Sequence, residues 1–242
     1  MSEPPAESAP NCRESQSPAA ATGAPRTAVF DLDGTLLAGD STAAWLRTLL
    51  FSSWLRCIAA AIALPVCLLL IWIPSSRNVG ASILLWIATV GQDQDAITDS
   101  IQVCAKRVTQ GDGALRWRGD GLATMHRHLA ADDRVIVVTA APEWLAARLL
   151  ASWTEVRVIG STLTRRWSGW VIEYHCFGKE KCRALQQKGY GSEWDFVYTD
   201  SYDDAPLLAA ATECGFIVNP RAGLVAKLSA MARSPISPLR WT

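Results

Sequence analysis

Two aspartates, Asp31 and Asp33, follow an apolar run at residues 27–30 and precede Gly34. Carboxylates at positions i and i+2 around a tight glycine turn can divide the work on a phosphate ester. One attacks phosphorus to form an aspartyl-phosphate, and the other protonates the leaving alcohol. The same pattern also occurs in calcium-binding loops and by chance, so this motif alone does not decide the chemistry.

Three further polar groups stand just after other apolar runs or near a helix start. Thr139 ends the run 134–138, and its hydroxyl can hold a non-bridging phosphate oxygen. A lysine near the start of a helix, either Lys179 or Lys181, can neutralise a phosphoryl group as charge shifts to it. Asp200 follows the run 196–199 and, together with Asp31, offers the hard oxygen ligands that Mg²⁺ prefers.

The order of these groups is more informative than any one of them. Taken singly, a threonine, a lysine or an acidic loop is more often structural or solvated. All four lie at or near the carboxyl ends of expected strands, which is the edge where open α/β sheets bind ligands. Their joint occurrence predicts a magnesium-dependent phosphoryl-transfer site.

Short apolar strands alternate with helical segments through most of the chain, which predicts an α/β fold with a doubly wound, mostly parallel sheet. The catalytic core is expected at residues 27–40 and 130–242. The expected strands are 27–30, 134–139, 156–159, 196–199 and 216–218, with a β-hairpin at 162–176 and helices at about 142–152, after Gly178 and after Pro206.

Two segments depart from this alternation. Residues 1–26 are rich in Pro, Ala, Ser and Glu and have no apolar run, which predicts a disordered tail without a secretory signal. The part of the chain that follows this tail is therefore expected to start on the cytoplasmic side. Residues 41–129 are helix-like throughout, which predicts an inserted helical cap.

The cap contains an apolar stretch at about residues 57–92, where Arg77 is the one charged residue. The segment 58–73 is marginal for a spanning helix, which needs about 20 apolar residues. Asp31 and Thr139 must meet in one site, so the insertion between them cannot cross a bilayer an odd number of times. Two crossings would place Arg77 outside, against the positive-inside tendency.

A re-entrant or surface-lying helical hairpin, broken near Pro74, is the remaining membrane arrangement. Its apolar residues, such as Leu69 and Trp72, are then expected to contact the membrane. The alternative is the buried helical cap of a soluble enzyme. Equal numbers of acidic and basic residues give no basic field, which argues against nucleic acid as a partner.

The order of motifs resembles the haloacid dehalogenase superfamily over roughly residues 27–220. The resemblance implies that the first strand lies centrally, that Asp31 is the nucleophile and that Asp33 is the acid and base. It also implies that Mg²⁺ is held by Asp31, Asp200 and the backbone carbonyl of Asp33, with Asp204 supporting the site and Thr139 binding phosphate.

The local pattern Cys176-Phe-Gly178-Lys-Glu-Lys181 is similar to the phosphoserine phosphatase-like branch, where a lysine follows glycine by three positions. That similarity implies Lys181 as the active-site lysine, catalytic and phosphate-binding, with Lys179 as the second choice. Where relatives often have glycine before the metal-binding aspartate, this chain has Thr199.

Shorter segments resemble a group of membrane-bound bacterial members that remove the phosphate from phosphatidylglycerophosphate. This resemblance implies a phospholipid phosphatase at the cytoplasmic face of the bacterial inner membrane. The first alternative is a soluble phosphatase for a small metabolite such as phosphoserine, and a more distant one is a non-catalytic membrane-anchored binding module. The segments that carry the resemblance are 84–86, 169–171, 176–181, 200–208 and 220–221.

Overall fold

A computed structural model describes residues 25–111 and 115–242 of the chain. Residues 1–24 of the predicted tail therefore lie outside the described residues. Arg26, which the prediction placed in the tail, lies against the folded core, because its Nε donates to Asp133 Oδ1 at 3.0 Å.

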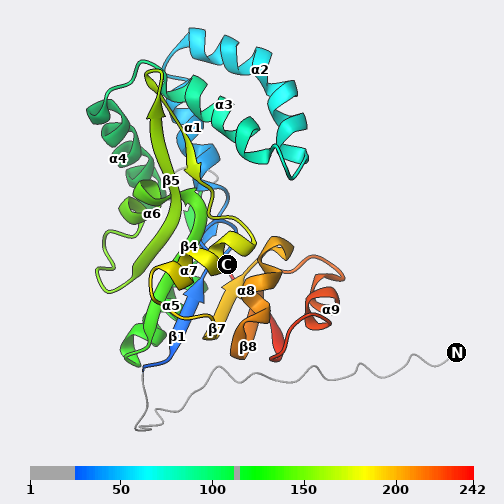
Figure 1. The fold of residues 1–242 in the computed structure, drawn as a ribbon. Coiled ribbons are helices and arrows are strands. Elements are labelled where there is room, and N and C mark those ends of the chain that lie inside the picture. Colours follow the sequence, from blue (N-terminus) through cyan, green and yellow to red (C-terminus); the bar gives the residue numbers. More distant parts are fainter. Residues whose placement is uncertain (1–24, 112–114) are drawn as a thin grey trace, which may run out of the picture.

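The core is a seven-stranded sheet in the order β6-β5-β4-β1-β7-β8-β9 (Figure 1). All neighbouring strands are parallel except the β5–β6 pair. The predicted α/β fold is thus confirmed, with the first strand at the centre between the strands that carry Thr139 and Asp200. The strands are β1 (Thr27–Phe30), β4 (Arg134–Pro142), β5 (Arg157–Arg166), β6 (Gly169–Tyr174), β7 (Trp194–Thr199), β8 (Ala211–Val218) and β9 (Ile236–Leu239).

Helices cover both faces of the sheet, because alternate residues of each central strand point to opposite sides. In β1, Phe30 packs in one buried cluster and Val29 in the other. The Phe30 face is covered by α5 (Gly119–Ala130) and α6 (Glu143–Leu149), and the Val29 face by α7 (Lys179–Gln187), α8 (Ala205–Ala209) and α9 (Leu224–Ser229). A strand buried on both faces needs the continuous apolar run that β1 has.

Three element bounds differ from the prediction. The helix expected at 142–152 is shorter, because β4 continues through Pro142 before α6 begins. The strand expected at 156–159 extends to Arg166, where it forms the predicted hairpin with β6. The strand expected at 216–218 already begins at Ala211 and pairs with β9, which the sequence pattern did not predict.

The insertion after β1 consists of four helices that rise above the carboxyl edge of the sheet (Figure 1). They are α1 (Ser41–Leu50), α2 (Trp54–Trp72), α3 (Arg77–Thr89) and α4 (Gln94–Gln110). A small antiparallel pair, β2 (Leu37–Ala38) with β3 (Arg116–Trp117), joins the two ends of the insertion. The helix α5, which the prediction included in the cap, packs against β4 of the core.

The helices α2 and α3 form the predicted hairpin, with the break between Trp72 and Arg77. They approach closely at Gly80, where an added Cβ atom would lie 2.6 Å from the Cys67 carbonyl oxygen. One side of α3 rests on β6, since the backbone N–H of Trp170 donates to Thr89 Oγ1 at 2.9 Å. The hairpin is therefore anchored to the core through α3, and α2 is its outer helix.

Most of the apolar surface of α2 faces outward. Leu69 is 58% exposed and Trp72 is 80% exposed. Among the described residues, α2 is the one helix long and apolar enough to cross a membrane, and only 11% of its most apolar window is buried. A core helix of a soluble protein passes the same test of length and composition but is mostly buried, whereas α2 is not.

Candidate active site

A cavity of about 480 Å³ lies between the carboxyl edge of the sheet and the inserted helices. Its floor is polar, and one wall is apolar with contributions from α1, α2, α3, β5 and β6. The floor includes Asp31, Asp33, Thr139, Lys181, Asp200 and Asp204, and the wall includes Leu46, Ile71, Leu84, Leu85, Leu163 and Ile172. The topology thus brings every predicted catalytic residue to one cavity.

The turn after β1 positions the first aspartate. The Asp31 N–H donates to the Tyr198 carbonyl oxygen of β7 at 2.9 Å, which continues the sheet pairing to the edge. The chain then turns at Gly34, which has φ +82°. A Cβ atom there would lie 2.1 Å from Asp200 Oδ2. Glycine is required both for this backbone conformation and for the close approach of Asp200.

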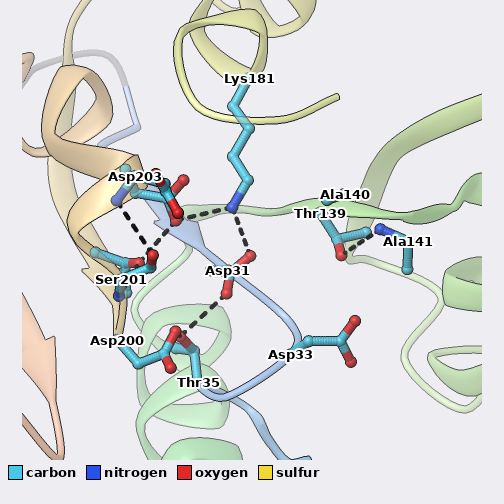
Figure 2. A network of polar contacts seen from close by, with 12 residues as sticks. Asp31, Asp33, Thr35, Thr139, Ala140, Ala141, Lys181, Asp200, Ser201 and Asp203 are labelled. Carbon is cyan, nitrogen blue, oxygen red and sulfur yellow. Dashed lines mark hydrogen bonds and ion pairs between the residues drawn. The ribbon is translucent and has the colours of Figure 1, made fainter. Parts of the chain in front are cut away.

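Lys181 connects the two acidic loops (Figure 2). Its Nζ donates to Asp31 Oδ1 at 2.6 Å and to Asp204 Oδ2 at 2.8 Å. Asp204 Oδ2 also accepts from Thr199 Oγ1 at 2.7 Å. Lys181 is 4% exposed, whereas Lys179 is on the surface. The structure therefore brings Lys181, and not Lys179, to the predicted nucleophile.

This network places opposite charges in a nearly dry environment. Burial raises the pKa of Asp31 to about 7, while Lys181 acts to lower it and the nearby Asp204 and Asp200 raise it further. Burial acts to lower the pKa of Lys181, but Asp204 and Asp31 outweigh that effect and raise it above its ordinary value. Lys181 is thus a permanent cation beside Asp31.

Asp200 lies on the other side of Asp31 (Figure 2) and has oxygens suited to a metal ion. Thr35 Oγ1 is 3.3 Å from Asp31 Oδ2 and 3.5 Å from Asp200 Oδ1. Burial and the charge of Asp204 raise the pKa of Asp200, and within the described ranges Asp200 forms no salt bridge. A divalent cation would neutralise this excess of negative charge.

The donor set fits Mg²⁺, although the described residues include no cluster of three or more His, Cys, Asp or Glu side chains arranged for a metal. Asp31 and Asp200 would supply two side-chain ligands, and the backbone carbonyl of Asp33 is the predicted third. Mg²⁺ keeps several waters and needs few carboxylates, so this sparse oxygen set suits it better than a closed protein cage would.

Asp33 is held apart from the lysine network. Its Oδ1 accepts from the Ser41 backbone N–H at 2.8 Å and its Oδ2 from Ser41 Oγ at 2.9 Å. Burial raises the pKa of Asp33 to about 7, the charge of Asp40 adds to this, and the bonds from Ser41 oppose it. The side chain points away from Asp200 (Figure 2), and its bonds to Ser41 hold it at the start of α1. A carboxyl group in this place can face a leaving group that enters from the cap side.

Thr139 lies across the cavity from Asp200, at the end of the regular part of β4 (Figure 2). Its Oγ1 accepts from the Ala141 backbone N–H at 3.1 Å, so the hydroxyl keeps its own proton for a phosphate oxygen. Ser161 Oγ braces the same segment by donating to the Ala140 carbonyl oxygen at 2.6 Å. The phosphate-binding role assigned to Thr139 remains a prediction.

Three hydroxyl residues contribute to the site in ways that the sequence analysis did not foresee. Thr35 bonds Asp31 and lies within reach of Asp200, Ser41 holds Asp33, and Thr199 supports Asp204. Thr199 was noted only as a departure from glycine. The position of Thr35 inside the aspartate motif was a usable signal, whereas nothing in the spacing pointed to Ser41.

Comparisons with known proteins identify the family and the fold. Residues 28–209 match the family model described as haloacid dehalogenase-like hydrolase. A protein of unknown function from Bordetella pertussis Tohama I is similar in structure, with 22% sequence identity, a TM-score of 0.70 and coverage of 88% of this chain and 98% of that one.

Two solved structures whose names give an activity are also similar. A substrate-bound phosphoserine phosphatase has 11% identity and a TM-score of 0.58 over 88% of this chain and 93% of that one. Cytosolic 5'-nucleotidase IIIB bound to cytidine has 13% identity and a TM-score of 0.54 over 88% of this chain and 80% of that one. At these identities the similarity establishes the fold.

Proposed function

The chain belongs to the haloacid dehalogenase-like hydrolase family, and we propose that it is a magnesium-dependent phosphatase that cleaves a phosphate monoester through an aspartyl-phosphate on Asp31. The observation that carries this proposal is the buried Lys181 bridge between Asp31 and Asp204, in a cavity that also contains Asp33, Thr139 and Asp200. A binding module without catalysis has no need to keep two buried carboxylates on one lysine.

The residues divide the reaction between them. A carboxylate oxygen of Asp31 forms a bond to phosphorus as the bond from phosphorus to the leaving alkoxide breaks, and Asp33 gives its proton to that alkoxide. Lys181 and Thr139 hold the non-bridging oxygens. A bound Mg²⁺ would neutralise charge on the phosphoryl group. In the second half, Asp33 accepts a proton from the water that hydrolyses the aspartyl-phosphate.

The acid role of Asp33 predicts a dependence on the leaving group. Asp33→Asn should reduce turnover of an alkyl phosphate by roughly 100-fold or more. An activated aryl phosphate, whose leaving group needs less protonation, should lose much less. Steady-state kinetics on both substrates measure the difference, and equal losses would contradict the acid role.

The proposed metal predicts reversible inhibition by chelation. EDTA should abolish phosphate release, and added Mg²⁺ should restore it, because an all-oxygen ligand set prefers a hard cation. Asp200→Asn should raise the Mg²⁺ concentration needed for half-maximal activity. Full activity of the wild-type protein after exhaustive chelation would refute the magnesium site.

We further propose that the substrate is a lipid phosphate monoester, and two features of α2 support this proposal. The apolar wall of the cavity includes Ile71 of α2, and its neighbours Leu69 and Trp72 on the same helix are exposed. An apolar route from the outer surface, past α2, to the polar floor is part of this proposal. Moving acyl chains into water would cost about 0.8 kcal/mol per CH₂, so a lipid substrate needs such a route.

The soluble alternative has support of its own. The similar structures whose names give a substrate act on phosphoserine or on a nucleotide, so the comparisons favour a small phosphate ester over a lipid. The finer proposal, a resemblance to phosphatidylglycerophosphatase C with phosphatidylglycerophosphate as substrate, rests on short sequence segments alone.

A phosphate-release screen in detergent tests the proposed function. The purified protein is offered phosphatidylglycerophosphate and phosphatidic acid in mixed micelles, together with phosphoserine and nucleoside monophosphates. We expect the highest kcat/KM for a lipid. A preference for phosphoserine over every lipid would leave the chemistry of Asp31 in place and replace the substrate class. Release from none of these substrates or from an aryl phosphate would refute the phosphatase itself.

The proposed membrane contact predicts a selective defect. Leu69→Asp with Trp72→Asp should move the protein from the membrane fraction to the soluble fraction of the cytoplasm, because charged residues on α2 oppose burial in the inner membrane. Lipid turnover should fall by about tenfold or more, while aryl phosphate turnover should stay near the wild-type rate. A wild-type protein that is soluble without detergent would contradict the membrane contact.

A further inference from the structure

The turn between β5 and β6 has an unusual residue at its most exposed point. Trp167 is 86% exposed and has φ +46°, and the next residue, Ser168, has φ +63°. A two-residue hairpin turn of this kind favours Asn-Gly, since most side chains are strained at positive φ. A bulky residue in the left-handed region is rare, and such strain is often associated with function.

Trp167 is flanked by two exposed cations, Arg165 and Arg166. Within the described part of the chain, neither arginine forms an ion pair. The residues 165–168, called the tip below, thus combine an exposed indole ring with two arginines that have no acidic partner. Nothing in the core requires this combination, because Trp167 contributes almost no buried surface.

The tip is fixed to the apolar hairpin and does not project independently. Trp86 Nε1 of α3 donates to the Arg166 carbonyl oxygen at 3.1 Å, and the Gly91 N–H donates to the Ser168 carbonyl oxygen at 2.8 Å. The start of α2 is bonded to the residue before Gly91, since Arg56 Nη2 donates to the Val90 carbonyl oxygen at 3.1 Å. In Figure 1 the end of β5 and the helix α2 lie at the same end of the molecule.

We propose that the tip is a second contact of this protein with a lipid bilayer, and that it recognises anionic lipids. This proposal rests on the membrane part of the proposed function and adds a site and a lipid charge to it. The Trp167 ring would lie at the level of the head groups, where amphipathic aromatic rings are favoured. Arg165 and Arg166 would face lipid phosphates while the exposed residues of α2 enter the apolar layer.

Charge is the reason for choosing a bilayer with anionic lipids as the occupant. The segment 51–92 contains no Asp or Glu. Of its two charged residues, Arg56 bonds Val90 beside the tip, whereas Arg77 lines the active-site cavity and stacks over Phe177. A surface made of apolar residues, tryptophan and arginine, with no acidic residue in the hairpin, matches the negative face of a bilayer. A second copy of this chain would bring the same positive charges together.

A turn exchange separates the lipid role from a structural role. Trp167→Asn with Ser168→Gly installs the residues that this turn favours, so the melting temperature should stay the same or rise. Binding of the full-length protein to vesicles should nevertheless fall by about tenfold, as expected for losing an indole ring that is about half buried in the membrane. Unchanged vesicle binding would overturn the proposal for Trp167.

A charge exchange tests the lipid preference. Arg166→Gln should lower the partition coefficient about fivefold on vesicles of phosphatidylcholine with phosphatidylglycerol, and not on phosphatidylcholine alone. Arg157→Gln is the matched control, because Arg157 is exposed at the opposite end of the same strand. Equal effects of the two substitutions, or equal binding of the wild type to both vesicle types, would overturn the proposal.

Two further measurements keep the outcomes distinct. Aryl phosphate turnover should be unchanged in all these variants, because the tip does not line the cavity. If the wild type binds anionic vesicles but releases no phosphate, the proposed function fails while the tip assignment stands. If the turn exchange alters the mass measured by light scattering in detergent and leaves vesicle binding unchanged, the tip is a contact between copies of this chain instead.

Discussion

Asp31→Asn should reduce kcat by at least about 10³-fold on every phosphate ester that the protein accepts, because the amide cannot form the aspartyl-phosphate and residues acting as one unit fail together. The same substitution should leave the fold nearly intact. Lys181 keeps its bond to Asp204 at 2.8 Å, so the buried ammonium retains a counter-ion. Kinetics and thermal unfolding of the purified variant measure both effects.

Asp99→Asn provides the control for Asp31→Asn, since Asp99 is an exposed residue of α4 outside the cavity. It should retain wild-type kinetics. Turnover by Asp31→Asn within tenfold of wild type would refute the nucleophile. A large fall in melting temperature would instead show that Asp31 is primarily structural.

Lys181→Met should damage both activity and stability. The substitution leaves Asp31 and Asp204 buried without their shared cation, and breaking a buried ion pair from one side costs about 3–5 kcal/mol. For a chain of this length that corresponds to a fall of roughly 10 °C in melting temperature. Activity should fall by about 10²–10³-fold, because a phosphoryl group then meets two negative charges without the lysine.

The stability deficit of Lys181→Met should depend on pH. Burial already raises the pKa of Asp31 to about 7 in the wild type, and losing Lys181 raises it further. The folded variant therefore binds more protons than the unfolded chain, so its stability should increase as pH falls. The difference from wild type should be smaller at about pH 5 than at about pH 8.

Lys179→Met is the matched control for Lys181→Met, because it makes the same chemical change two residues earlier on the surface. It should match wild type in activity, in melting temperature and in the pH dependence of both. A comparable loss in Lys179→Met would mean that the contact between Lys181 and Asp31 is not what supports catalysis.

The contrast between Asp31 and Lys181 follows from how the charges are arranged. Two carboxylates share one ammonium group, so removing a carboxylate leaves a balanced pair, whereas removing the ammonium leaves two like charges. Asp204→Asn should therefore have nearly the same melting temperature as Asp31→Asn. It should not show the large loss of activity expected for Asp31→Asn. Asp204 holds the lysine but is not assigned a bond to phosphorus.

The sequence by itself determined the fold class and the order of the catalytic residues. The reason is local: apolar runs of four to six residues ending in Asp31, Thr139 or Asp200 predict buried parallel strands, and the carboxyl ends of such strands meet at one edge. The break of the apolar hairpin near Pro74 was equally local, because the sequence Pro-Ser-Ser between two apolar helices favours a turn. These features depend on residues close together in the chain.

Only the tertiary structure decided which groups touch. The family pattern favoured Lys181 over Lys179 without showing a contact, and the rotation of α7 buries Lys181 against Asp31 and leaves Lys179 on the surface. The hydrogen-bond partner of Asp33 is Ser41 at the start of α1. The path of the chain as it leaves the sheet brings these two residues together. Likewise, Trp167 reads as an ordinary turn residue until the structure places its turn beside α3 and the exposed face of α2 nearby. Side-chain contacts between distant segments depend on helix rotation and packing, which local sequence patterns do not encode.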